Sequence, residues 1–80
     1  MRIDVLLFAH YADQLGTGAL ALELPDGASL ADAVAAVRAR PGAERIPGTP
    51  LAAVNERWAP ADHALSDGDT VALLPPVAGG

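Results

Sequence analysis

One amphipathic segment, residues 29–40, constrains the fold of this 80-residue chain more than any other feature. Ser29 can cap a helix, and Asp32 follows three residues later, where a carboxylate stabilises the positive end of the helix dipole. Three apolar residues recur at the spacing of one helix face, namely Leu30, Val34 and Val37. The pattern predicts one main helix, which Pro41 and the following glycine bring to an end.

Strand-like segments lie on both sides of this helix. Residues 2–8 carry apolar side chains on both of their sides, which is typical of a buried, central strand. Residues 9–15 contain good helix formers and predict a short helix that Gly16 closes. The remaining predicted strands are residues 19–24, 51–55 and 70–74, with a short edge strand at residues 57–58.

This order of elements predicts an α+β fold, with a mixed sheet of four to five strands wrapped on one main helix. A helix that connects two strands of one sheet forms a right-handed crossover. The β-grasp, or ubiquitin-like, fold has this order of strands and helices. We expect one domain over residues 1–74, followed by an extended C-terminal tail over residues 75–80.

The charge and residue types exclude several functions. The net charge is −5, and all five basic residues are scattered arginines, so the chain has no electrostatic footprint for nucleic acid or an anionic membrane. An acidic chain of this kind suits basic protein surfaces. The absence of cysteine excludes disulfides, zinc-thiolate sites and cysteine nucleophiles.

Neither a targeting segment nor a metal site is evident. No apolar run approaches the ~20 residues of a membrane helix, and the N-terminus carries Asp4 and no cleavage site, so we expect a cytoplasmic protein. His10 and His63 have no metal-ligand companions at helical spacing and are expected to be solvated. We therefore expect no bound metal and no catalytic side chain on this chain.

The C-terminal tail is the most informative segment for function. Its residues are Pro75, Pro76, Val77, Ala78, Gly79 and Gly80. The prolines bias the tail to an extended form, and six residues at about 3.3 Å each reach roughly 20 Å from the body. The two glycines lack Cβ and can pass a narrow channel. The terminal carboxylate of Gly80 is then the predicted working group.

Four stretches give the chain a resemblance to a known family. They are Val5–Ala9 (VLLFA), Leu51–Asn55 (LAAVN), Leu65–Ala72 (LSDGDTVA) and Leu74–Gly80 (LPPVAGG). On these residues the chain resembles the sulfur carrier, or small, subunits of molybdopterin synthase, which have the β-grasp fold. The family often carries an Arg-Glu pair shortly after the Phe-Ala, where this chain has Ala12 and Asp13.

The resemblance implies a chemistry that starts at Gly80. A ubiquitin-activating-like adenylyltransferase would use ATP and magnesium to form an acyl-adenylate there, and sulfur would replace AMP to give a thiocarboxylate. The tail would then enter the large catalytic subunit, in a heterotetramer of two small and two large subunits, and give sulfur to cyclic pyranopterin monophosphate. The product is the dithiolene of molybdopterin. This chain itself would bind no cofactor and would act as the sulfur-donating subunit of the enzyme.

Phe8 and Leu74 are candidates for the partner interface. They end the first and last predicted strands, so both would lie near the root of the tail if those strands were adjacent and parallel. Ordinary core packing is the alternative for both residues, and the role of Trp58 is open.

Three other functions share the predicted fold. A thiamin-type sulfur carrier also ends in Gly-Gly, although such carriers are usually shorter and lack the Pro-Pro. A ubiquitin-like modifier would be joined to target lysines through Gly80. A plain interaction module would carry an inert tail.

Overall fold

The computed structural model describes residues 1–76. Its elements in chain order are β1 (Arg2–Leu7), α1 (His10–Leu15), β2 (Ala19–Glu23), α2 (Leu30–Arg38), β3 (Leu51–Val54), β4 (Arg57–Trp58) and β5 (Thr70–Leu74). Every predicted element is present, with bounds that differ by at most one or two residues at either end.

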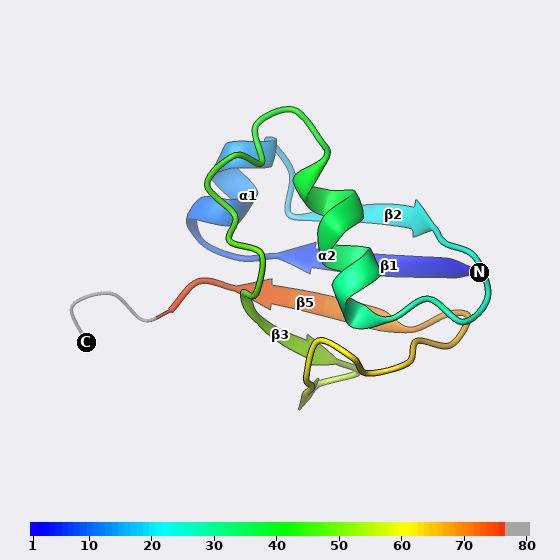
Figure 1. The fold of residues 1–80 in the computed structure, drawn as a ribbon. Helices are drawn as coiled ribbons and strands as arrows, with labels where there is room; N and C mark the ends of the chain where they lie inside the picture. The colour runs from blue at the N-terminus through cyan, green and yellow to red at the C-terminus, as the bar shows by residue number, and fades with distance from the viewer. Residues whose placement is uncertain (77–80) are drawn as a thin grey trace.

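The five strands form one mixed sheet in the order β2-β1-β5-β3-β4. β1 and β5 run parallel at its centre, and the other neighbouring strands are antiparallel. α2 runs across the strands on one face of the sheet (Figure 1). The predicted α+β class and the central place of the first strand are confirmed.

The capped start of α2 follows the sequence signal. The Asp32 backbone N–H donates to Ser29 Oγ at 3.3 Å, and the Ser29 backbone N–H donates to Asp32 Oδ2 at 2.8 Å. At the other end, Arg38 Nε donates to the Ile46 carbonyl at 2.9 Å and ties down the loop after the helix. α2 is therefore held at both ends on the sheet.

The core lies between α2 and one face of the sheet. Alternate residues of β1 and β5 are fully buried there, together with the apolar stripe of α2: Ile3, Val5, Leu7, Leu30, Val34, Val37, Val71 and Leu73. The prediction that the first strand is buried on both sides is wrong, because Leu6 is 36% exposed. No helix covers the second face of the sheet within residues 1–76, so the outward apolar residues of β1 meet solvent.

Candidate functional site

The root of the tail lies where the two central strands end together. The parallel strands β1 and β5 end on the same side of the sheet (Figure 1). Leu7 is opposite Leu73, so Phe8 and Leu74 follow directly at the same end of these two strands. The adjacent, parallel arrangement on which their candidacy depended is thus present. Phe8 is 43% exposed and Leu74 is half-buried, so neither is a fully buried core residue. Their contact with a partner stays a prediction.

The chain leaves this edge through Pro75 and Pro76. The remaining predicted site residues, Val77, Ala78, Gly79 and Gly80, lie outside the residues that the structure describes. Their threading role and the reactivity of the Gly80 carboxylate therefore stay predictions. The structure does give the place of departure, at the end of a central strand.

The face of the sheet that points away from α2 carries apolar residues on four neighbouring strands. Paired residues share a face, and the pairings place Leu6, Ala72, Ala53 and Trp58 in one row across β1, β5, β3 and β4. Leu74 and Leu51 are paired in the next row. We call this surface the apolar face. Its solvent-accessible members are Leu6, Phe8, Leu51, Trp58, Ala72 and Leu74, and Ala53 is buried among them.

The large apolar residues with the highest exposure within residues 1–76 all belong to the apolar face. They are Leu6 (36% exposed), Phe8 (43%), Leu51 (49%) and Trp58 (69%). Folding alone gives no reason to leave four such side chains together in water, because each gains free energy by burial. A contiguous exposed apolar patch is typical of a protein interaction site.

Sequence reasoning identified only part of this surface. It found Phe8 and Leu74 from their positions at strand ends, and it left Trp58 unassigned. Leu6 was interpreted as part of a buried strand, and Leu51 was treated as an ordinary strand residue. The signal that joins them is the cross-strand register, which the chain's local patterns do not give.

A groove on the same face ends at the turn between β3 and β4. It is lined by Leu6, Phe8, Asn55, Glu56, Thr70 and Ala72. Asn55 Nδ2 donates to Asp69 Oδ1 at 2.9 Å, and the Thr70 backbone N–H donates to Asn55 Oδ1 at 3.0 Å. These bonds fix the turn against the start of β5.

Asp69 is the charged group at the centre of this network. A hydrogen bond from the Ser66 backbone N–H, at 2.8 Å, and a second from the Asn55 amide hold the pKa of Asp69 below its usual value. The ionised carboxylate is therefore part of the folded structure at neutral pH.

A strained corner connects β1 to α1 beside Phe8. Ala9 has φ 50° and ψ −131°, which is the first central position of a type II′ turn, where glycine is favoured. The Tyr11 backbone N–H donates to the Phe8 carbonyl at 3.1 Å and closes that turn. Tyr11 is buried beneath it, and burial raises the pKa of its hydroxyl. The corner thus holds Phe8 at the border of the apolar face.

Comparison with known proteins decides the family. The model of the ThiS family matches residues 5–80. The chain belongs to the ThiS family. Two full-length relatives are each named molybdopterin synthase sulfur carrier subunit. The protein from Escherichia coli is 41% identical over 98% of this chain and 99% of its own, and that from Chlamydomonas reinhardtii is 39% identical over 100% of both chains.

Solved structures related to this ThiS family chain confirm the β-grasp fold. SAMP1 from Haloferax volcanii superposes with a TM-score of 0.88 at 27% identity, over 100% of both chains. One chain of the complex of subunits 1 and 2 of molybdopterin-converting factor from Helicobacter pylori superposes with a TM-score of 0.73 at 25% identity, over 100% of both chains. The family match and the full-length relatives confirm the resemblance to sulfur carrier subunits that the sequence indicated.

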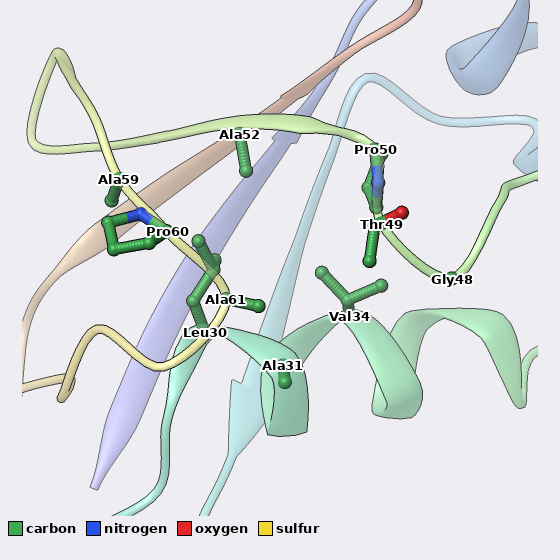
Figure 2. Close-up of a pocket in the computed structure, with 10 residues that line it drawn as sticks. All are labelled: Leu30, Ala31, Val34, Gly48, Thr49, Pro50, Ala52, Ala59, Pro60 and Ala61. Atoms are coloured by element: carbon green, nitrogen blue, oxygen red, sulfur yellow. The ribbon is translucent and has the colours of Figure 1, made fainter.

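A second pocket, of about 260 Å³, lies on the helix side of the sheet (Figure 2). It is lined by Leu30, Ala31, Val34, Gly48, Thr49, Pro50, Ala52, Ala59, Pro60 and Ala61. Among the residues of the described part of the chain that line it, Thr49 has the only polar side chain, and none is titratable. Such a pocket offers no acid, base or nucleophile beyond one hydroxyl, so we assign no chemistry of the ThiS family to it.

Neither histidine of this ThiS family chain belongs to a group of metal-ligating side chains within residues 1–76. His10 packs edge-on against the Tyr11 ring, with centroids 4.9 Å apart. Across residues 1–76, no three His, Asp or Glu side chains come close enough to hold a metal ion. No helix in the same residues is long and apolar enough to span a membrane.

Proposed function

We propose that this chain is the sulfur carrier subunit of molybdopterin synthase. Full-length similarity to proteins of that name, within the ThiS family, carries the proposal. The structure adds a physical reason, because the central strand β5 ends at Leu74, a residue of the apolar face, and Pro75 and Pro76 at the start of the tail follow it directly. The folded domain would bind the partner proteins, and the terminal carboxylate of Gly80 would be the reacting group.

The reaction begins by making the Gly80 carboxylate reactive. A carboxylate is a poor electrophile, because its negative charge repels nucleophiles and oxide is a poor leaving group. An adenylyltransferase would use ATP and magnesium to attach AMP to the carboxylate and release pyrophosphate. Sulfur from a donor would then replace AMP, and the product would be a thiocarboxylate, a soft anionic nucleophile like a thiolate.

The second half of the reaction would take place in the large catalytic subunit. The tail would enter that subunit's active site and transfer sulfur to cyclic pyranopterin monophosphate, and two transfers would complete the dithiolene. Acid and base groups would come from the large subunit, while this chain would supply the reactive atom and its position. We expect two small and two large subunits in the complex, in the cytoplasm.

The apolar face is the surface that would dock on these partners. Phe8 and Leu74 lie at its edge nearest the tail root, and Trp58 lies on its outer strand. A bound partner would remove the exposed side chains from water at the edge from which the tail leaves. Roughly 20 Å of extended tail then suffices to reach a buried active site.

The decisive test follows the mass of the chain through the reaction. The chain is incubated with the adenylyltransferase, ATP, magnesium and a sulfur source, and intact mass spectrometry detects replacement of one oxygen by sulfur at Gly80. Adding the large subunit and cyclic pyranopterin monophosphate should then consume the thiocarboxylate and form molybdopterin. A chain ending at Gly79, or extended by one residue, is the matched control and should do neither. Molybdopterin formation at the normal rate by the control would refute the proposal.

A protein modifier is the second candidate function, because some solved structures of similar fold are modifier proteins. The small archaeal modifier protein 1 from Haloferax volcanii superposes with a TM-score of 0.85 at 26% identity, over 95% of this chain and 98% of its own. A modifier would form stable bonds to lysines of other proteins, whereas a carrier recycles unconjugated. Blotting for conjugates in cells distinguishes these two, and the step with cyclic pyranopterin monophosphate separates the proposed carrier from a thiamin-type carrier.

A further inference from the structure

The backbone separates two kinds of turn in this chain. Among residues 1–76, positive φ occurs at four glycines, Gly16, Gly27, Gly42 and Gly68, and at three other residues, Ala9, Asn55 and Glu56. Asn55 and Glu56 line the groove on the apolar face, and Ala9 directly follows Phe8 on the same face. Within residues 1–76, residues with a side chain therefore adopt positive φ only in turns that border the apolar face.

Glu56 is the least expected of the three. Val54 and Arg57 are paired, so Asn55 and Glu56 form a two-residue hairpin turn with φ 51° and 70°. Positive φ at both central positions is a type I′ turn, and glycine is strongly favoured at the second of them. Asparagine tolerates this conformation, and its side chain makes the two hydrogen bonds that anchor the turn. Glutamate has no such local reason to stand there.

No hydrogen bond or ion pair within residues 1–76 offsets the strain of placing glutamate at this position. Glu56 is exposed, and its carboxylate makes no hydrogen bond or ion pair with any group in residues 1–76. Among residues 1–76 it is the one ionisable residue that lines the groove, and the same lining includes Leu6 and Phe8. A carboxylate beside apolar side chains on a rigid hairpin is preorganised to meet a cation that arrives with an apolar surface.

We propose that Glu56 is the charged contact of the docking surface and pairs with a lysine or arginine side chain of the large subunit. The inference rests on the proposed function and adds a residue that fixes how the partner is oriented. The apolar contact would exclude water from around the pair and so strengthen its attraction. The chain's own net charge of −5 favours a basic partner surface in the same way.

The test compares three variants for binding to the cognate large subunit by calorimetry at low and high salt. Glu56→Gln removes the charge and keeps the side chain's size, and we expect about a fivefold rise in Kd at low salt. Glu56→Gly should weaken binding equally while raising the thermal midpoint, because it relieves the turn. Glu44→Gln, in the loop after α2, makes the same change of net charge away from the apolar face and should leave Kd unchanged.

Salt supplies an independent readout. The Kd of the parent chain should rise with salt more steeply than that of Glu56→Gln, because one ion pair is lost from the variant's interface. An unchanged Kd and salt slope in Glu56→Gln, or an equal effect in Glu44→Gln, would overturn the pairing and leave the sulfur carrier function standing. Failure of the parent chain to bind the large subunit would instead overturn the proposed function, and the pairing with it.

Discussion

The two faces of the sheet are built from the same strands and serve different purposes. On the covered face, Val5, Val71 and Leu73 are completely buried against α2 and its loops. The open face is the opposite side of the sheet, which carries the residues of the apolar face. There the neighbouring residues of those strands include Leu6, which is more than one-third exposed. The covered face supplies the free energy of folding through burial. The open face keeps its apolar area available, which is what a carrier that must bind partners requires.

The backbone shows the same contrast. The turn between β2 and α2 places glycine at positive φ, at Gly27, where an added Cβ would meet open space. Turns beside the open face place Ala9 and Glu56 in such conformations. Residues with a side chain at positive φ are strained, and such residues cluster at functional sites. The predictions below test this division, from the largest expected effect to the smallest.

Truncation on the covered face should unfold the protein. Leu73→Ala removes a completely buried side chain at the centre of the sheet, and we expect it to lower the free energy of unfolding by about 2–5 kcal/mol. Urea denaturation followed by circular dichroism measures the change. Binding to the large subunit should be lost only in proportion to the unfolded fraction. If Leu73→Ala stayed folded but bound the large subunit more weakly, the covered face would also contribute to binding, and the proposed division between the two faces would be wrong.

Truncation on the open face should have the opposite profile. Trp58→Ala and Phe8→Ala remove exposed side chains, so we expect the free energy of unfolding to change by no more than about 0.5 kcal/mol. Each should weaken binding to the large subunit tenfold or more, equivalent to about 1.4 kcal/mol, because aromatic anchors dominate interfaces. Calorimetry gives Kd, and urea denaturation gives stability. Unchanged binding in both variants would show that the partner docks elsewhere.

Relief of strain beside the open face should stabilise the chain. Ala9 is exposed, so its methyl group gains little from packing, and Ala9→Gly should raise the free energy of unfolding by about 1 kcal/mol. The matched control is Gly27→Ala, which introduces a methyl group at positive φ with nothing within 4 Å and should destabilise by a similar amount. Equal, opposite shifts in the urea midpoint confirm the argument. Destabilisation by Ala9→Gly would disprove it.

The sequence predicted the elements well because their signals are local. The cap formed by Ser29 and Asp32 and the alternation in residues 70–74 each depend on a few neighbouring residues. The identity of the tail was equally readable, because it needs no partner within the fold. Local signals therefore gave the elements, the fold class and the family.

The surface could not be read in the same way, because it depends on register. The row that joins Leu6 to Trp58 exists only because Ala72 and Ala53 lie opposite each other between them. Leucine in a strand has the same appearance in sequence whether the face is covered or open. Sequence also gave no hint that Ala9 and Glu56 adopt glycine conformations, since nothing in their local pattern demands it.

The smallest expected effect concerns the turn that carries Glu56. The pKa of Asp69 is lowered in the folded chain, first by the hydrogen bond from the Ser66 backbone and then by that from Asn55. Its stabilisation is therefore fully present above the unfolded pKa of about 3.9 and is lost as pH falls towards the lower folded pKa. Asp69→Asn should accordingly lower the thermal midpoint at pH 7, and the gap from the parent chain should narrow below about pH 4. Thermal melts across that range measure the gap. A gap that is constant with pH would mean that the charge on Asp69 does not anchor this edge of the open face.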